Sequence, residues 1–349
     1  MTRFVDTQAL ASLLARVGTR TFMAELAELM KSDYVRWHEF DKSARLASHS
    51  DIGVIELMPI ADASQYAFKY VNGHPSNTQR GLSTVMAFGA LADVDTGFPT
   101  LLSELTLSTG VRTAVASAVA AEKLARADAR TMGLIGCGAQ SEFQAIAFES
   151  LVGIEHVKLY DVDAAAVGKL ERNLRAHTDL EVEVAASAAE AAERVDVLTT
   201  ATADKAHATI VTADMLSAGL HINGVGGDCP GKTELAAEVL EAASVFVEYE
   251  PQTRIEGDIQ QMPESFAVTE LWSVLAGEHP GRLHHAEVTV FDSVGFALED
   301  YSMLKLVHRY AESLNIGEQV DLVPTLDDNK DLFGLIDRQL TPVKSRTAA

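Results

Sequence analysis

The spacing of apolar residues changes near residue 44. Before that point they recur every three to four positions, which predicts two amphipathic helices: a short one over 6–18 that ends at Gly18, and a longer one with Phe22 and Trp37 on its apolar stripe. From residue 44 to 107, short apolar runs alternate with Asn-Gly, Pro and Gly turns, which predicts a mostly antiparallel sheet. Its expected strands include 53–58, 66–71 and 83–88.

A second pattern begins at residue 130, where apolar runs alternate with helical segments. Such runs are typical of parallel strands that are covered on both faces. An alanine-rich helix, capped by Ser108 or Thr109, is expected to precede this region and to end near residue 126. A further helix is expected over 186–194. The expected strands are 131–136, 156–161, 180–185, 195–201, 220–225, 244–249 and 287–292.

The two patterns predict an α/β protein with two domains, which suits a chain of 349 residues. One domain, over 129–304, is expected to be a Rossmann-type doubly wound parallel sheet. The other, over 1–128 plus 305–349, is expected to be an α+β domain with an antiparallel sheet. Its C-terminal part is expected to be helical and to return to the first region.

The sequence at the first parallel strand predicts a dinucleotide site. Gly136 and Gly138 follow the strand, and glycines there let a pyrophosphate approach the backbone and the helix N-terminus beyond. Ser141 fills the third small position. Asp161 ends the second strand, where an acid suits the ribose diol of NAD and repels the extra phosphate of NADP. The alternative is an ordinary turn between a strand and a helix.

Three cations lie in apolar or strand-like surroundings: Arg45, Lys69 and Arg112. Arg112 is expected in the first turn of its helix, where a cation opposes the helix dipole and a nearby anion would relieve it. The three together could hold a substrate carboxylate, with the arginines binding in bidentate fashion. Singly, each could also be a surface charge in solvent or in a salt bridge.

A second glycine-rich run, over 221–234, follows another strand of the parallel sheet, so its loop belongs to the edge where ligands bind. Asp228 is a candidate general base or partner for a substrate ammonium, and Lys232 is close to it in sequence. The alternative is an aspartate that makes hydrogen bonds within its turn. The run 292–295 ends a further strand and could line the nicotinamide side of the cleft.

Other polar residues have less specific surroundings. Glu56 is an acid inside an apolar strand and could alternate outward. His74 and His221 are candidate bases, but single histidines near turns are more often structural, and no metal-ligand spacing surrounds them. We therefore expect no metal. Cys137 and Cys229 are not spaced as CxxC and are interpreted as small packing residues.

Composition limits the possible partners. The net charge is −22 and no block of basic residues occurs, so nucleic acid and anionic membranes are unlikely partners. Hydrophobic residues make up 47% and charged residues 22% of the chain, a profile typical of soluble globular proteins. The N-terminus has no hydrophobic signal core, and no apolar run is long enough to span a membrane. A cytoplasmic location is expected.

These motifs resemble the ornithine cyclodeaminase/μ-crystallin family over nearly the full chain. The resemblance extends beyond GCGAQS at 136–141 to GGDCPGKTEL at 226–235. Cys137, in the variable slot between the fingerprint glycines, is the visible departure. The matching runs are 41–45, 54–59, 68–75, 136–141, 226–235, 248–257 and 290–300.

The resemblance implies a homodimer with NAD as cofactor, in which the sheet domain binds substrate and pairs with its twin. It implies that Arg45, Lys69 and Arg112 hold the α-carboxylate, Asp228 is the acid/base residue that also holds an amine, and Glu56 is a second acidic contact. Lys232 and Val294 would lie near the substrate. The residues expected to line the cofactor are Thr84, Arg112, Gly136, Gly138, Ala139, Gln140, Ser141, Asp161, Thr202, Val225, Lys232 and Ser293.

The implied reaction converts L-ornithine to L-proline and ammonia, as a step of proline biosynthesis. NAD takes a hydride from Cα, the δ-amine attacks the imine, ammonia leaves and the cyclic imine takes the hydride back. The sequence leaves alternatives open on the same scaffold: a lysine cyclodeaminase, a ketimine reductase, an amino-acid dehydrogenase or a non-catalytic binding protein. One methylene of substrate is worth only about 1–3 kcal/mol of discrimination, and no motif reports it.

Overall fold

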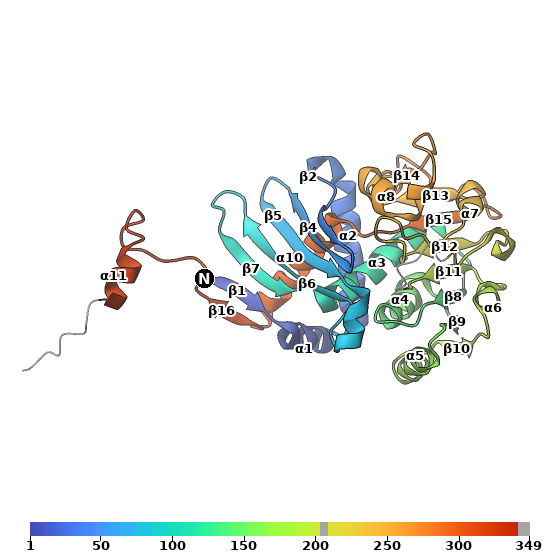
Figure 1. Cartoon of the computed structure of the whole chain (residues 1–349), viewed down its shortest axis with the longest axis horizontal. Coiled ribbons are helices and arrows are strands. Elements are labelled where there is room, and N and C mark those ends of the chain that lie inside the picture. The colour runs from blue at the N-terminus through green and yellow to red at the C-terminus, as the bar shows by residue number, and fades with distance from the viewer. Residues whose placement is uncertain (203–208, 341–349) are drawn as a thin grey trace, which may run out of the picture.

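The computed structural model describes residues 1–202 and 209–340. In these residues the strands form two sheets with helices between them (Figure 1). The mixed sheet has the order β16-β1-β7-β6-β5-β4-β2, with β3 paired to β4, and only β1 and β7 run parallel. Its strands are β1 (Thr2–Val5), β2 (Asp41–Lys42), β3 (Leu46–Ser50), β4 (Gly53–Ala61), β5 (Gln65–Gly73), β6 (Val85–Asp93), β7 (Pro99–Glu104) and β16 (Glu318–Val320).

Alternation along the strands of the mixed sheet gives it two different faces. On β4, Glu56, Met58 and Ile60 are buried, and on β5, Ala67, Lys69 and Val71 are buried. Because side chains alternate between faces, two of the candidate site residues point into the protein with the core residues. The expectation that Glu56 could alternate outward is wrong. The opposite face leaves Ile55, Tyr66 and Phe88 exposed.

Four helices pack near or against the mixed sheet: α1 (Thr7–Val17), α2 (Thr19–Val35), α3 (Thr106–Leu124) and α10 (Ala297–Ser313). Asp6 caps α1 through the N–H of Ala9, and Gly18 ends it with a positive φ of 88°, as the sequence predicts. Helices α2, α3 and α10 share one apolar core with β4 to β7, and this core also includes Phe291 of the other sheet. The core therefore joins the two sheets.

Helix α3 begins earlier than expected. It starts at Thr106 and not at Ser108 or Thr109, because the Glu104 carboxylate accepts a hydrogen bond of 2.7 Å from the N–H of Leu107. Arg112 consequently lies in the second turn, which corrects the expectation that it opposes the dipole in the first turn. The cation must be balanced by other groups.

The second sheet is parallel throughout and confirms the Rossmann-type prediction. Its order is β10-β9-β8-β11-β12-β15-β13-β14. All seven expected strands are present, and the two-residue β14 was not predicted. The strands are β8 (Thr131–Ile135), β9 (His156–Tyr160), β10 (Glu181–Val184), β11 (Val197–Thr200), β12 (His221–Gly224), β13 (Ser244–Val247), β14 (Thr269–Glu270) and β15 (Thr289–Asp292).

Helices cover the parallel sheet and extend its core. Helix α4 continues into a π-helical turn (Phe148–Val152), and α8 is followed by the 3-10 helix η5 (Asp258–Gln261). The helix expected over 186–194 is the shorter α6. The helices are α4 (Ser141–Ala147), α5 (Ala164–His177), α6 (Ala188–Ala192), α7 (Ala237–Glu241), α8 (Glu250–Glu256) and α9 (Leu271–Leu275).

The C-terminal part returns to the first region as expected. Helix α10 contacts α2 and strands β4 to β6, so the expected domain boundary at 304/305 falls inside one continuous helix. Beyond β16, the chain runs out to α11 (Gly334–Leu340), which lies apart from the other elements at the left of Figure 1 and contains no buried residue. No helix in the described part of the chain is long and apolar enough to cross a membrane.

Candidate cofactor and substrate site

The candidate site is built at the carboxyl edge of the parallel sheet. Five neighbouring strands end side by side in register. Their last residues are Tyr160 of β9, Ile135 of β8, Thr200 of β11, Gly224 of β12 and Asp292 of β15. The loops that carry the predicted cofactor residues therefore begin in one row. Strand β8 pairs with β9 on one side and β11 on the other, which is the switch point where open α/β sheets bind ligands.

The turn after β8 has the geometry that a dinucleotide requires. Gly136 has a φ of +97°, and a Cβ there would lie 2.5 Å from the carbonyl oxygen of Ala201. A Cβ at Gly138 would meet nothing within 4 Å, so that side of the turn is open to a ligand. Ser141 Oγ donates to the carbonyl of Gly136 at 2.8 Å, which fixes the turn to the first residue of α4.

The residues around this turn fit NAD. The N–H of Cys137 donates to Asp161 Oδ2 at 2.7 Å, so the acid that would face a ribose is held against the fingerprint turn. Gln140 has a buried Oε1 with no hydrogen-bond partner among the described residues. Helix α4 also starts without a side-chain cap, which leaves its first N–H groups for an anion. Gly138 and Ala139 are exposed beside them.

The next loops bring further predicted residues together. Lys232 Nζ donates to the carbonyl of Thr202 at 2.9 Å and to Asp228 Oδ1 at 3.4 Å. Burial lowers the pKa of Lys232, but Asp228 and Glu234 raise it more, so the net pKa lies above its ordinary value. Lys232 is buried, whereas the Asp228 side chain is 52% exposed and accessible to a ligand.

The other predicted cofactor residues lie around these loops. Val225 follows β12, and its N–H donates to the carbonyl of Thr200 at 2.9 Å. Thr84 lies before β6, where its carbonyl accepts hydrogen bonds from the N–H of His74 and the side chain of Asn72. The structure thus joins Thr84 to the mixed sheet, and its role toward the cofactor stays a prediction.

Arg45 links the two sheets at the site. Its guanidinium pairs with Glu56 at 3.0 Å and with Glu256 at 2.9 Å. It also donates to the carbonyls of Val294 and Gly295, at 2.6 and 2.8 Å, in the loop after β15. Its side chain is only 6% exposed, so the alternative that Arg45 is a solvated surface charge is wrong.

Lys69 and Arg112 form a second buried network. Lys69 Nζ lies 2.9 Å from the Asp300 carboxylate, and Arg112 Nε lies 3.2 Å from the same carboxylate. Arg112 Nη1 also pairs with Glu299 at 2.7 Å. A Cβ on Gly295 would come within 2.3 Å of Arg112 Nη1, so both arginines reach the same loop. The three predicted cations are therefore neighbours, and each already has an acidic partner.

The charges in this cluster shift one another's pKa values. Burial, with the neighbouring Arg112 adding to it, lowers the pKa of Lys69 to about 8 although Asp300 opposes the shift. Burial raises the pKa of Glu256 to about 8. Arg45 opposes this rise, and the neighbouring acids Glu56 and Asp228 add to it. The Glu56 carboxyl group adds to the rise because two neighbouring carboxylates disfavour ionisation of each other. Burial likewise raises the pKa of Glu299 to about 7.

A buried glutamate orders the loop after β15. Glu248 accepts hydrogen bonds from Ser293 Oγ at 2.7 Å and from the N–H groups of Val294 and Gly295 at 3.3 and 3.0 Å. This contact fixes two residues that the sequence predicts near cofactor and substrate. Burial raises the pKa of Glu248.

The structure assigns packing roles to other candidates. His221 is fully buried, its Nδ1 lies 3.0 Å from Thr289 Oγ1, and burial lowers the pKa of its imidazole to about 3. Burial raises the pKa of the Cys137 thiol to about 12. Both findings support the structural interpretation of these residues. In residues 1–202 and 209–340, no group of three His, Cys, Asp or Glu side chains is placed to hold a metal ion.

Sequence reasoning named Glu56 but missed the other three acids that pair with the cations. Glu256, Glu299 and Asp300 are separated from their partners by long stretches of chain, and the last two resemble ordinary acids in the first turn of a helix. The sequence did offer one indication, because Glu299 and Asp300 are two adjacent acids in an otherwise apolar segment at the beginning of α10. Only the folded chain shows which cations they face.

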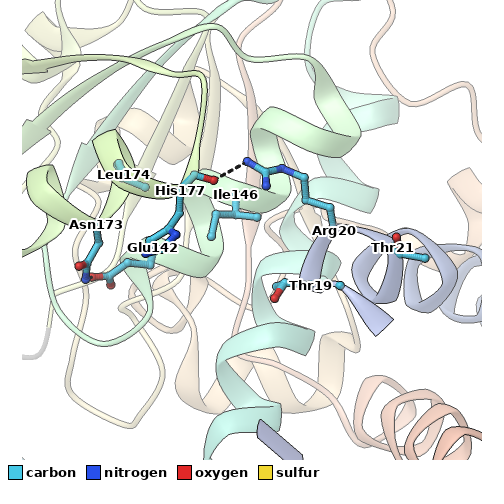
Figure 2. A pocket seen from close by; sticks show the side chains of 9 residues that line it. Thr19, Arg20, Thr21, Glu142, Ile146, Asn173, Leu174 and His177 are labelled. Carbon is cyan, nitrogen blue, oxygen red and sulfur yellow. Dashed lines mark hydrogen bonds between the residues drawn. The ribbon is translucent and has the colours of Figure 1, made fainter. Parts of the chain in front are cut away.

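One surface pocket lies away from these residues. It has a volume of about 560 Å³ and lies between the start of α2 and helices α4 and α5, where Arg20 donates to the carbonyl of His177 at 2.8 Å (Figure 2). Thr19, Glu142 and Asn173 are among its lining residues. None of the predicted site residues in the described chain lines it.

Comparison with known proteins places this geometry in a family. The ornithine cyclodeaminase from Brucella suis is 52% identical over 333 residues, which cover 95% of this chain and 93% of that protein. A solved lysine cyclodeaminase, studied for recognition of L-lysine, L-ornithine and L-2,4-diaminobutyric acid, superposes with a TM-score of 0.90 at 30% identity, covering 96% and 99% of the two chains. An archaeal alanine dehydrogenase dimer with bound NAD superposes with a TM-score of 0.84 at 31% identity, covering 92% and 99%.

The sequence profile of the ornithine cyclodeaminase/mu-crystallin family matches residues 7–315. This range includes both sheets except β1 and β16, and all the candidate site residues. The chain belongs to the ornithine cyclodeaminase/mu-crystallin family.

Proposed function

We propose that the protein is an NAD-dependent ornithine cyclodeaminase, a cyclising ammonia-lyase that converts L-ornithine to L-proline and ammonia. The observation that carries the proposal is the convergence of Arg45, Lys69 and Arg112 beside the carboxyl edge of a dinucleotide-binding sheet. Buried cations in contact with a ligand site suit a carboxylate, because charge-assisted hydrogen bonds are strongest there. The half-exposed Asp228, whose charge acts on Arg45, would supply a proton acceptor.

The three cations would bind and orient the α-carboxylate. The two arginines enclose the loop at Val294 and Gly295, and Lys69 approaches from β5. Holding a substrate in a reactive orientation is worth about 7–11 kcal/mol of the barrier. The acids that pair with the cations hold the side chains in place before substrate arrives.

Asp228 would move the protons of the substrate amines. Bound NAD supplies a hydride acceptor that oxidises Cα and later returns the hydride, so the overall reaction is redox-neutral. A carboxylate in this position takes a proton from the attacking amine and gives one to the leaving ammonia, which is typically worth about 10²–10⁴-fold in rate. Glu56 would be a second acidic contact, through the network that it forms with Arg45. The buried side chains of this network would limit the access of water, and so would limit hydrolysis of an imine.

NAD would be held by the turn after β8 and by the loops beside it. Gly136, Gly138 and Ser141 shape the turn, and Asp161, held against it by the N–H of Cys137, would face the ribose. Ala139, Gln140, Thr84, Thr202, Val225 and Ser293, with Arg112 and Lys232, would complete the cofactor contacts.

We also propose a homodimer formed through the outer face of the mixed sheet. Ile55, Tyr66, Met86 and Phe88 are exposed on that sheet, and the Tyr70 and Phe88 rings stack with centroids 5.0 Å apart. The detached α11 also exposes apolar side chains that a second copy could cover. The dimeric alanine dehydrogenase with the same fold supports this proposal. Light scattering of the purified chain should give twice the monomer mass.

The proposed function is tested by product analysis. The purified protein is incubated with NAD and L-ornithine, and proline, ammonia and NADH are quantified. We expect equal amounts of proline and ammonia without net NADH. Net NADH in proportion to ornithine consumed would instead identify an amino-acid dehydrogenase. In Asp228→Asn, unchanged turnover would remove the acid/base role from that residue.

A second candidate is a lysine cyclodeaminase. It is favoured by the close structural similarity to a lysine cyclodeaminase whose recognition of both L-lysine and L-ornithine has been analysed. A panel of diamino acids read by mass spectrometry separates the two activities, since lysine gives a six-membered ring. The role in proline biosynthesis and the cytoplasmic location belong to the ornithine proposal.

A further inference from the structure

We propose that Gln260 is a positioning residue that fixes the Cys229–Lys232 turn and thereby aims Asp228 and Lys232 at the substrate. The proposal rests on the proposed function, in which Asp228 moves protons. It concerns a residue that lies on η5, in a different element from the loop that carries the acid.

The loop after β12 has few internal hydrogen bonds, among them one of 3.1 Å from the N–H of Lys232 to the carbonyl of Cys229. It contains Gly226, Gly227 and Gly231, and Gly231 has a φ of +80°. Glycines allow many backbone conformations, so contacts from outside the loop help to select the single conformation that an acid/base residue requires. The half-exposed Asp228 gives the loop little packing of its own.

The side-chain amide of Gln260 supplies that constraint. Its Oε1 accepts a hydrogen bond of 2.6 Å from the N–H of Gly231. Its Nε2 lies within donating distance of the carbonyls of Cys229 and Lys232, at 3.2 and 3.0 Å. The same nitrogen faces the carbonyl of Gly257 at 2.8 Å, which ties the side chain to its own segment. One amide therefore contacts three of the four residues of the Cys229–Lys232 turn.

This role needs both halves of an amide. A carboxylate would accept from Gly231 but would face the carbonyl oxygens of Cys229 and Lys232 without a hydrogen to donate. An aliphatic side chain would satisfy none of these groups. The neighbouring Gln261 has the same side chain but donates to the carbonyls of Leu235 and Asp258, both at 2.9 Å, beyond the turn. Gln261 is therefore a matched control for a general effect on η5.

Lys232 connects the turn to Thr202, a residue predicted to contact the cofactor. Its ammonium donates to Thr202 and Asp228, so a shift of the turn changes the position of both groups. Two of the three cations in the carboxylate clamp are held away from the turn, because Lys69 and Arg112 pair with Glu299 and Asp300. Loosening the turn should consequently impair turnover more than substrate binding.

The experiment compares Gln260→Ala, Gln260→Glu and Gln261→Ala with the wild type, as full-length protein with saturating NAD. Steady-state assays give kcat and KM for L-ornithine, and hydrogen–deuterium exchange gives the protection of peptides over 225–234. Both Gln260 variants should lower kcat about 10- to 100-fold with KM changed less than about threefold, because a misplacement near 1 Å costs that much in rate. Exchange should increase over 225–234 and not over 136–141. Gln261→Ala should retain kcat.

The outcomes separate this proposal from the proposed function. Unchanged exchange over 225–234 in both Gln260 variants overturns the bracing role, whatever the activity. Faster exchange with wild-type kcat overturns the positioning role. An equal loss of kcat in Gln261→Ala assigns the effect to η5 as a whole and overturns the proposal for Gln260. If the wild type forms no proline, the proposed function fails, and exchange over 225–234 still decides whether Gln260 holds the turn.

Discussion

The cofactor turn and the cation cluster belong to one site but differ in burial and in charge. The turn after β8 is shaped by backbone: Gly138 is exposed with open space beside it, and the charged side chains of Asp161 and Lys169 contact only its N–H and carbonyl groups. The cation cluster is buried and densely charged, and Arg45, Lys69 and Arg112 each contact acids. The turn offers a ligand exposed backbone with open space, whereas the cluster must accept a substrate carboxylate among carboxylates already present.

This difference determines which substitutions damage each part. The turn depends on the absence of a side chain at two glycines, so adding one atom damages it. The cluster depends on charge balance, so removing one charge damages it and the fold with it. Burial raises the pKa values of Glu256 and Glu299, which favours their protonated forms in a cluster that has more acids than cations.

Removing a buried cation should have the largest effect. Lys69→Met leaves the Asp300 carboxylate with Arg112 alone, at 3.2 Å, in a site where Lys69 is 1% exposed. Breaking a buried pair costs about 3–5 kcal/mol, and we expect the lower end because Arg112 remains. Urea unfolding should show this loss, and the KM for ornithine should rise in the protein that stays folded.

Lys31→Met is the matched control for that variant. Lys31 pairs with Glu28 and Glu122 at a partly exposed position, where such pairs are worth less than about 1 kcal/mol. If both lysine variants destabilised the protein equally, burial of the cluster would not be the reason for the Lys69 effect.

A methyl group in the turn tests the other region. Gly138→Ala places its Cβ in open space, so the free energy of unfolding should stay unchanged while the affinity for NADH falls about tenfold or more, because the pyrophosphate needs that approach. Fluorescence titration measures the affinity. Gly136→Ala should also destabilise the fold by about 1–3 kcal/mol, because its φ is +97° and its Cβ would meet Ala201. Unchanged NADH binding in Gly138→Ala would contradict the proposed cradle.

The same contrast explains what the sequence could predict. The turn and Asp161 lie within 26 residues, and strand, glycines, helix and acid follow one another locally, so their arrangement can be inferred from spacing. The seven predicted strands of the parallel sheet are likewise local apolar runs. The cation cluster was identified as three basic residues in apolar contexts with Glu56 of β4, but its other acids come from α8 and α10. Pairs separated by 187 to 231 residues leave no periodic signal.

The incorrect expectations have equally specific causes. The start of α3 was placed at Ser108 or Thr109 because serine and threonine are good caps, whereas Glu104 binds the N–H of Leu107 from outside the helix. The two-residue β14 is too short to show alternation. Gln260 gave no signal, because an amide on a short 3-10 turn becomes informative only when the loop at 229–232 is folded beside it.

A smaller effect is expected from Asp161. Asp161→Ser should reduce the preference for NAD over NADP about tenfold, because it removes a carboxylate that accepts from a ribose hydroxyl and repels a 2′-phosphate. Cofactor titrations of both forms give the ratio. Asp163→Ser is a suitable control, since Asp163 caps α5 through Ala165 and lies two residues further along the chain. An unchanged ratio in Asp161→Ser would refute the assignment.

The smallest effect is expected from the proton on Glu256, which tests charge balance in the cluster directly. The folded pKa of about 8 exceeds the ordinary value of 4.5 because of burial, with Glu56 and Asp228 adding to the rise and Arg45 opposing it. The folded state therefore keeps a proton that the unfolded state releases between these values. The contribution to stability is complete below pH 4.5 and is lost as the pH rises through about 8.

Glu256→Gln removes this titration while keeping the shape of the side chain. The free energy of unfolding of the variant, measured by urea at a series of pH values from 5 to 8, should fall less steeply with pH than that of the wild type. One proton corresponds to at most about 1.4 kcal/mol per pH unit, and coupling to Glu56 reduces the difference. Glu278→Gln, at an exposed position, should leave the slope unchanged. Parallel slopes for Glu256→Gln and the wild type would mean that the cluster balances its cations with ionised acids alone, so that substrate binding would add a negative charge without a proton to offset it.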